Sequence, residues 1–315
     1  MRLHRPLRRA VPVLCGALLA LAAPRPLAAQ QVADSAFVPD VGGARWPAGT
    51  GPRLVLDEAH GNFHTLAGRY TAFGRLARAV GFRVAPHGAP FTDASLHDVD
   101  VLVIANALAP RNAGGNWRLP TPSAFTREEI AAVHRFVERG GGLLLIADHM
   151  PFAGAAEALG RVLGVQFANA FALDTAGGGG PLVFRRGQGL TDTALVSGVT
   201  PVDSVVTFTG SAFRLLGEGT PLLALPDTLR LWLPTQAWVF GDTVPSLAAD
   251  GWLQGAARRI GRGRVVVLGE AAMLSAQLSG PQRTPMGMNA PVAAQNARWA
   301  ARLLRWLAGD ATATR

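Results

Sequence analysis

Short apolar runs alternate with longer amphipathic segments along this chain of 315 residues, and this alternation is what most constrains its fold. The apolar runs have the length of buried strands and occupy residues 53–57, 82–85, 99–107 and 143–147. The amphipathic segments have helical spacing and occupy residues 66–80, 126–139 and 153–163. Strands that alternate with helices form a parallel sheet with helices on both faces, so we expect an α/β fold.

Two of these helices carry clear boundary residues. Thr126 and Glu129 have the spacing of a capping box, which predicts that a helix begins directly after Thr126. Gly81 follows the segment 66–80 and predicts its end, because glycine adopts the left-handed backbone that closes many helices.

Residues 176–262 interrupt the alternation with short β-type runs that turn residues separate. The runs occupy residues 205–208, 222–225, 229–233 and 237–240. We therefore predict one domain over residues 53–310, with an antiparallel β-rich insertion at about 176–262. A buried strand is predicted at 264–268, an amphipathic helix at 292–307, and an extended lead-in over residues 30–52.

Residues 1–29 have the order of a secretory signal peptide. A start rich in arginine precedes an apolar run over residues 10–23, and small residues at 27–29 precede Gln30. The apolar run is too short to span the roughly 30 Å bilayer core as a helix, which needs about 20 residues. We therefore expect a periplasmic or secreted protein without a stable membrane anchor after cleavage.

Composition excludes several kinds of chemistry. All 30 basic residues are arginine, so neither a Schiff-base lysine nor the phosphate-binding lysine of ATPases is present. The only cysteine is Cys15, which lies in the predicted signal peptide, so we expect no thiol nucleophile in the mature chain. The net charge of +9 comes partly from the arginines of residues 1–29, and we expect no nucleic-acid partner.

Polar side chains follow the ends of the predicted strands. They are Asp57, Glu58, His60, Asn62, His64, Asn106, Asp148, His149 and Glu270. If the strands have the flavodoxin-like order 2-1-3-4-5, these strand ends meet at one edge of the sheet. We expect Asp57, His60, Asp148 and His149 to converge on one pocket, with Asn106 and Glu270 at its edge.

These residue types support three kinds of role. The candidates for acid–base catalysis are Asp57, Glu58, Asp148, His149 and Glu270. The candidates for ligand binding are His60, Asn62, His64 and Asn106, and a divalent metal ion is a further hypothesis on His60, His64, Asp148 and His149. The structural alternative is that each side chain only caps nearby backbone N–H groups, as polar residues after strands often do.

Three segments resemble a bacterial family of unknown function within the class I glutamine amidotransferase-like superfamily. They are VLDEAHGNFHT at 55–65, VLVIAN at 101–106 and GGGLLLIADHMPF at 140–152. The resemblance covers residues 53–175 and 262–308, and it implies a flavodoxin-like three-layer sandwich with a mostly parallel sheet. It also implies that Asp148 and His149 occupy the elbow where true amidotransferases carry a nucleophilic cysteine, so amidotransferase activity is not expected.

Three functions remain open from the sequence. The first is a secreted domain that binds a small polar or glycan ligand at the carboxyl ends of the strands. The second is a hydrolase of envelope or extracellular material, with or without a metal ion, that uses Asp, Glu and His at the same edge. The third is an envelope scaffold that binds other proteins through the β-rich insertion. Two carboxyl groups close to each other and to a histidine in an open pocket would favour the hydrolase.

Overall fold

The computed structural model describes residues 31–174, 179–197 and 200–310, so the predicted signal peptide lies outside the described residues. Five parallel strands form one end of a twelve-stranded sheet, in the order β3-β2-β4-β5-β16 with β3 at the edge. They are β2 (Arg53–Asp57), β3 (Arg83–His87), β4 (Val101–Ala105), β5 (Gly142–Ile146) and β16 (Gly263–Leu268). Numbered along the chain, this is the order 2-1-3-4-5, and the predicted flavodoxin-like α/β fold is confirmed.

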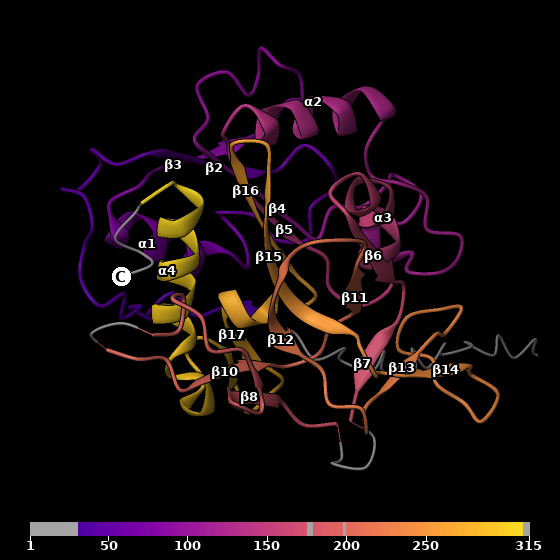
Figure 1. The fold of residues 1–315 in the computed structure, drawn as a ribbon. Coiled ribbons are helices and arrows are strands. Elements are labelled where there is room, and N and C mark those ends of the chain that lie inside the picture. The colour runs from indigo at the N-terminus through magenta and orange to yellow at the C-terminus, as the bar shows by residue number, and fades with distance from the viewer. Residues whose placement is uncertain (1–30, 175–178, 198–199, 311–315) are drawn as a thin grey trace, which may run out of the picture.

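Helices cover both faces of these parallel strands (Figure 1). The helices are α1 (Thr71–Val80) and α4 (Asn296–Leu307) on one face, and α2 (Arg127–Glu138) and α3 (Phe152–Val162) on the other. Successive side chains of β2 point alternately into the two helix layers on opposite faces of the sheet. Leu54 and Leu56 belong to the core cluster that includes α1 and α4, whereas Val55 belongs to the cluster that includes α2 and α3.

The capping residues set the helix boundaries as predicted in two places. The Thr126 side chain accepts from the Glu129 N–H, and the Glu129 carboxylate accepts in return from the Thr126 N–H. Gly81 closes α1 with a φ of 112°. The predicted helix start at residue 66 is wrong, because the Glu58 carboxylate holds the Leu66 N–H at 2.7 Å and α1 begins only at residue 71.

Further strands extend the central sheet beyond β16, and they pair mainly antiparallel. They are β15 (Leu253–Ile260), β12 (Thr220–Ala224), β9 (Gly189–Leu190), β8 (Leu182–Arg186) and β10 (Ser204–Thr207), with β11 (Ala212–Leu215) and β6 (Val165–Ala168) attached through β15. A separate sheet contains β7 (Phe171–Leu173), β13 (Arg230–Trp232) and β14 (Ser246–Ala248). The predicted strand at 237–240 is wrong: these residues form a turn, in which Trp238 has a φ of 65° that no strand accommodates.

The lead-in segment packs onto the domain. Its strand β1 (Val32–Ala33) joins β17 (Ala276–Ser279) and β18 (Thr284–Gly287) in a small antiparallel sheet. Phe37 and Trp46 pack against the core cluster beneath α1 and α4. Short 3₁₀ turns are η1 (Ala113–Gly115), η2 (Ala272–Leu274) and η3 (Pro291–Ala293). Within the described residues, no helix has both the length and the apolar composition to span a membrane.

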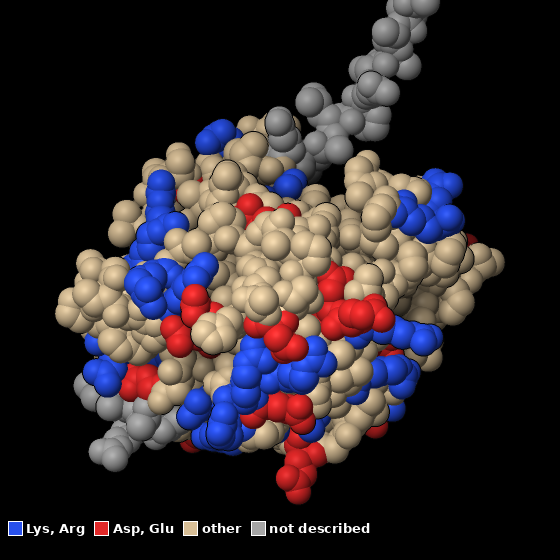
Figure 2. Space-filling view, turned by 90° about the horizontal axis from the view of Figure 1, so that it is seen from above, with Lys and Arg blue, Asp and Glu red and all other residues tan. Residues whose placement is uncertain are grey.

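Arginine and acidic side chains are interspersed on the face viewed from above, toward which α2 lies in Figure 1 (Figure 2). Asp93 pairs with Arg135 at 2.7 Å and with Arg139 at 3.1 Å, both near the end of α2. Exposed ion pairs of this kind contribute little to stability, so the stability of the fold comes mainly from the core clusters and the helix caps.

We predict that Thr126→Ala lowers the free energy of unfolding by about 1 kcal/mol, because α2 loses the side-chain half of its capping box. Chemical denaturation measures this change. Thr228→Ala, in an exposed turn, is the matched control and is expected to have no measurable effect. Equal stability of the two variants would contradict the capping role of Thr126.

Candidate functional site

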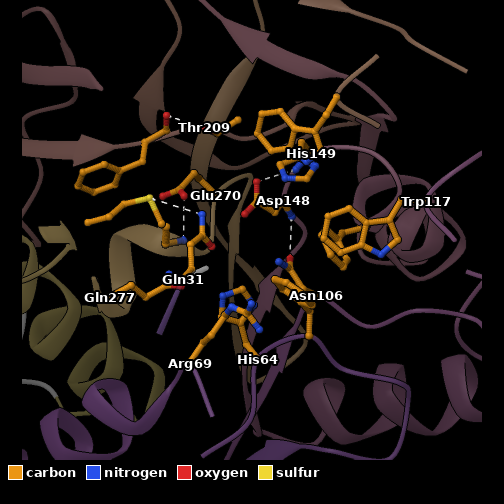
Figure 3. Close-up of a pocket in the computed structure, with 16 residues that line it drawn as sticks. Gln31, His64, Arg69, Asn106, Trp117, Asp148, His149, Thr209, Glu270 and Gln277 are labelled. Atoms are coloured by element: carbon orange, nitrogen blue, oxygen red, sulfur yellow. Dashed lines mark hydrogen bonds between the residues drawn. The ribbon is translucent and has the colours of Figure 1, made fainter. Parts of the chain in front are cut away.

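A cavity of about 600 Å³ opens at the edge of the sheet where β4, β5 and β16 end (Figure 3). Its lining comes from the loops after these strands, from the loop before α1, and from β17, β18 and the β-rich insertion. The lining residues are Gln31, Phe63, His64, Arg69, Asn106, Trp117, Asp148, His149, Phe152, Phe208, Thr209, Trp238, Glu270, Ala272, Gln277 and Met286. This is the edge at which open α/β sheets bind ligands.

The structure brings together only part of the predicted site. The predicted residues that line the cavity are His64, Asn106, Asp148, His149 and Glu270. The predicted residues that do not line it are Asp57, Glu58, His60 and Asn62. The expected convergence of Asp57 and His60 with Asp148 and His149 is therefore wrong.

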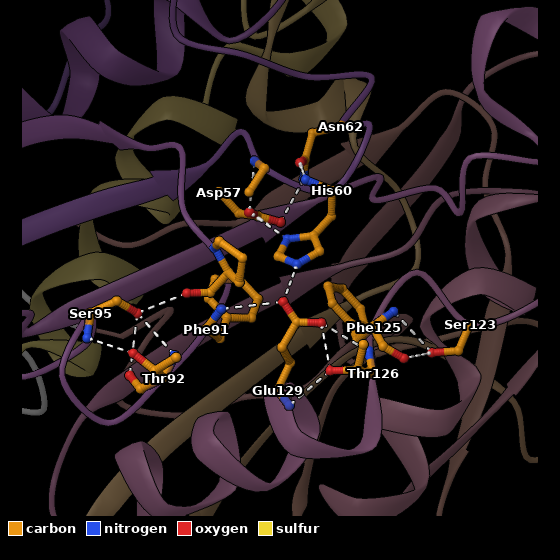
Figure 4. Close-up of polar contacts among 12 residues, drawn as sticks. Asp57, His60, Asn62, Phe91, Thr92, Ser95, Ser123, Phe125, Thr126 and Glu129 are labelled. Atoms are coloured by element: carbon orange, nitrogen blue, oxygen red, sulfur yellow. Dashed lines mark hydrogen bonds and ion pairs between the residues drawn. The ribbon is translucent and has the colours of Figure 1, made fainter.

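Asp57 and His60 instead form a separate buried cluster with Glu129 of α2, here called the Asp57–His60–Glu129 cluster (Figure 4). His60 Nδ1 lies 2.8 Å from Asp57 Oδ1, and His60 Nε2 lies 2.9 Å from Glu129 Oε1. Asp57 shares the strand face of Val55, which is the face that α2 covers, and this alternation turns it toward Glu129. Asn62 completes the cluster by donating to Asp57 Oδ2 at 2.9 Å.

The electrostatics of this cluster indicate a structural role. Burial alone would lower the pKa of His60, but the hydrogen bonds and charges of Asp57 and Glu129 outweigh burial and raise it. Burial opposes the charged form of Glu129 as well, yet hydrogen bonds from Thr126 and His60 lower the pKa of Glu129 to about 2. The cluster therefore holds an imidazolium between two carboxylates and fastens the loop after β2 to the start of α2.

The structure does not assemble the hypothesised metal site. Among the described residues, no group of three or more His, Cys, Asp and Glu side chains has the arrangement to hold a metal ion. His60 has both ring nitrogens bonded to carboxylates, and it lies apart from the cavity that His64, Asp148 and His149 line. Glu58 also lies outside the cavity lining, where it holds the Leu66 N–H.

Asn106 connects three of the loops at the sheet edge. Its side-chain Oδ1 accepts from the Asp148 N–H at 2.9 Å, and its backbone carbonyl accepts from the Phe63 N–H at 3.0 Å. Its φ is 50°, a left-handed conformation in which few residues other than glycine are found and which clusters at functional sites. Since Oδ1 is occupied, the amide Nδ2 is the free end, and it is buried without a hydrogen-bond partner.

Asp148 and Glu270 follow the adjacent strands β5 and β16, and both satisfy backbone groups. Asp148 Oδ1 accepts from the His149 N–H at 2.7 Å. Glu270 accepts from the N–H groups of Ala272 at 2.8 Å and Met273 at 2.7 Å. Burial raises the pKa of both carboxyl groups, and the charge of Asp148 raises the pKa of Glu270 further, so the pair resists carrying two negative charges.

His149 is fixed in an aromatic wall. Its ring stacks on Phe171 with 4.3 Å between centroids and meets the edge of Trp238 at 4.8 Å. His149 Nδ1 lies 2.7 Å from the carbonyl of Met150. Because a carbonyl only accepts, Nδ1 carries a proton and donates it to this carbonyl, which fixes the orientation of the ring.

Several polar atoms of the cavity lining are buried without any hydrogen-bond partner. They are His64 Nδ1, Arg69 Nε, Asn106 Nδ2 and Gln277 Oε1. Burial, together with the smaller effects of the charges of Arg69 and His149, lowers the pKa of His64 to about 3, so this ring is neutral. An unsatisfied buried polar group costs about 1–3 kcal/mol, and a ligand that pairs with such groups offsets that cost.

Most of the aromatic lining carries no signal in the sequence that indicates its place at the cavity. Trp117 lies in a long loop after β4, and Trp238 lies in a turn where a strand was predicted, so neither topology nor spacing indicated that they line the cavity. Phe63 and Arg69 lie close to predicted residues in the loop between β2 and α1. An aromatic residue directly before His64 was the one local indication available.

Comparison with known proteins supports the fold. No protein-family model matches the chain, and no curated protein sequence matches it. The mmIFT52 N-terminal domain is similar in structure, with a TM-score of 0.56, 12% identity, and coverage of 81% of this chain and 97% of that domain. At this identity, the likeness shows the fold alone.

Two ThuA-like proteins are also structural neighbours, and such proteins belong to the class I glutamine amidotransferase-like fold family. The protein from Bacteroides uniformis has a TM-score of 0.45 and 13% identity, over 84% of this chain and 95% of that one. The protein from Parabacteroides merdae has a TM-score of 0.42 and 11% identity, over 82% and 90%.

We predict that His60→Gln lowers the free energy of unfolding by about 3 kcal/mol, because Asp57 and Glu129 lose the cation between them. The raised pKa of His60 gives stability that is fully present below pH 6.5 and lost as the pH rises through the folded value. The lowered pKa of Glu129 gives stability that is present above pH 4.5 and lost toward pH 2. Urea unfolding across pH should therefore show the largest difference from wild type between pH 4.5 and 6.5.

The matched control is His97→Gln, because His97 pairs with Asp98 at 2.7 Å but its side chain is 83% exposed. This substitution is expected to leave unfolding unchanged at every pH. A difference between His60→Gln and wild type that does not vary with pH would refute the charged cluster.

Proposed function

We propose that this protein binds a small carbohydrate in the cavity at the sheet edge. The observation that carries the proposal is a wall that combines aromatic rings with buried polar atoms that lack partners. A sugar ring matches both features, because it has apolar C–H faces and an edge of hydroxyl groups that donate and accept. The cavity of about 600 Å³ lies within the usual range for small-molecule sites.

The aromatic side chains form a packed platform. Trp117 meets Phe63 and Phe152 edge to face, each with 5.1 Å between ring centroids. Trp238 lines the same cavity and is 52% exposed, so it offers a ring face or edge toward solvent. Rings that are held by their neighbours lose little entropy on binding, which favours affinity.

The polar groups are oriented before any ligand arrives. The Asp148 N–H donates a hydrogen bond to Asn106 Oδ1, and this fixes the amide so that Nδ2 remains a donor without a partner. Ser275 donates its hydroxyl proton to the Ala272 carbonyl and so accepts from Gln277 Nε2 at 2.7 Å. Gln277 Oε1 is therefore a free acceptor, and the cavity offers both hydrogen-bond roles that sugar hydroxyls need.

Hydrolysis of such a ligand is the second candidate function, supported by the presence of Asp148, His149 and Glu270 in one cavity. A buried carboxyl group with a raised pKa is suited to act as a general acid. Binding is favoured over hydrolysis because both carboxyl groups already accept hydrogen bonds from backbone N–H groups. These bonds fix the loops that follow β5 and β16.

Amidotransferase chemistry is not part of this proposal. That reaction needs a thiolate, and the position after β5 carries Asp148 and His149 instead. The sequence has its only cysteine at Cys15, within the predicted signal peptide. The same signal peptide supports a periplasmic or secreted location for the binding site.

We predict that purified protein lacking residues 1–29 binds at least one sugar from a panel of monosaccharides and disaccharides, measured by titration calorimetry and thermal shift. Trp117→Ala should weaken the binding by about tenfold or more, because it removes the centre of the aromatic platform. Trp306→Ala, the same change outside the cavity lining, should leave the affinity unchanged.

Two results would redirect the proposal. If no sugar in the panel binds to the wild-type protein, the carbohydrate site is rejected. If a sugar is cleaved, and Asp148→Asn abolishes cleavage while binding persists, the protein is the hydrolase of the second candidate.

We also predict that the purified protein releases no ammonia from glutamine in a coupled assay, because the elbow after β5 carries no cysteine. Ammonia release that His149→Ala abolishes would overturn this prediction. A known glutaminase serves as the positive control for the assay.

A further inference from the structure

Arg69 lines the cavity with a positive charge that no acidic side chain among the described residues neutralises by a salt bridge. Some other partly buried arginines of the protein have acidic partners, and some do not. Arg298 pairs with Asp40, and Arg305 with Asp310. Arg264 and Arg302 form no salt bridge among the described residues either, but neither lines the cavity. Arg69 is therefore the guanidinium without an acidic partner that a ligand in this cavity would meet.

The guanidinium of Arg69 is held in place. Its central carbon lies 3.9 Å from the centroid of the Phe63 ring, a close cation–π contact. Its Nε is buried without a hydrogen-bond partner. Burial lowers the pKa of Arg69, but an arginine stays protonated in proteins, so the charge remains. A guanidinium stacked on a ring keeps its N–H donors at its edge, free for a planar acceptor.

The groups around Arg69 suit an anion. Figure 3 shows Arg69 and His64 on one side of the cavity, and Asp148 and His149 on the other. His64 is neutral, so it carries no negative charge that could neutralise Arg69. Asn106 adds a free amide donor in the same lining. Asp148 and Glu270 hold backbone N–H groups, and neither forms a salt bridge with Arg69.

We propose that the ligand of this cavity carries one carboxylate, which Arg69 binds, so that the preferred ligand is an acidic sugar such as a uronic acid. This inference rests on the carbohydrate site proposed above. A carboxylate is favoured over a phosphate because Arg69 is the only arginine in the described lining and the chain contains no lysine. A doubly charged phosphate would meet one cation and two acidic side chains in this cavity, whereas one carboxylate matches the guanidinium fork.

The test compares matched pairs of ligands that differ only in the carboxylate. Glucuronate and glucose, and galacturonate and galactose, are titrated into protein lacking residues 1–29, together with benzoate and succinate as carboxylates without a sugar ring. Wild type should bind at least one uronate about tenfold or more tighter than its neutral partner. Arg69→Gln should remove this preference, so that the uronate and its neutral partner bind with equal affinity.

Two further variants make the result specific to Arg69. Arg69→Lys keeps the charge but loses the planar fork, so it should restore part of the preference for the uronate. Arg111→Gln removes an exposed arginine from outside the cavity lining and should change nothing. Circular dichroism and thermal melting verify that each variant is folded, and detectable binding of the neutral sugar verifies that the cavity is still present.

The outcomes separate this inference from the carbohydrate proposal. Equal affinity for uronate and neutral sugar, or an unchanged preference in Arg69→Gln, overturns the role of Arg69 and leaves the carbohydrate site standing. Binding of benzoate or succinate that depends on Arg69, without binding of any sugar, supports the anion site and rejects the carbohydrate. Absence of binding by every ligand rejects both.

Discussion

The parallel pairing of β5 with β4 on one side and β16 on the other is the constraint on which the cavity depends. Ile146 of β5 is in register with Ala105 of β4 and with Leu268 of β16, so the three strands end at the same level. The residues that follow them therefore meet at one edge, and Asn106 joins the first two loops by accepting from the Asp148 N–H. The β-rich insertion then contributes Phe208, Thr209 and Trp238, which close the cavity opposite the loop before α1.

Two groups of buried polar residues lie near this edge, and they differ in whether their hydrogen bonds are satisfied. In the Asp57–His60–Glu129 cluster, both ring nitrogens of the histidine face carboxylates, so a ligand would find little left to bind. In the cavity, His64, Arg69, Asn106 and Gln277 each keep a buried atom without a partner. Satisfied networks stabilise a fold, whereas unsatisfied groups lower stability and persist mainly where function requires them. This difference separates a structural cluster from a binding site more clearly than residue type does.

The sequence predicted the parts of the structure that follow local or topological rules. The alternation of apolar runs predicted the parallel sheet, and the capping box at Thr126 predicted the start of α2. Strand order predicted that Asn106, Asp148 and Glu270 share one edge. The error at Asp57 arose because its partner Glu129 lies far along the chain, although alternation with Val55 already indicated the face toward which it turns. Trp117 and Trp238 could not be predicted as part of the lining, because they lie in a loop and a turn without periodicity.

The similarity in fold indicates where a ligand binds, whereas the side chains of the site determine which ligand binds. A shared sheet and helix arrangement at 12% identity gives the edge where a ligand binds, but one fold hosts many activities. The identity of the ligand depends on the side chains that the loops and the insertion add to this edge. Here those side chains include neutral acceptors and donors, stacked rings, and one arginine whose charge no described residue neutralises. A half-buried charge without a partner lowers the stability of the empty protein, and the anion that we propose for this cavity would remove this cost.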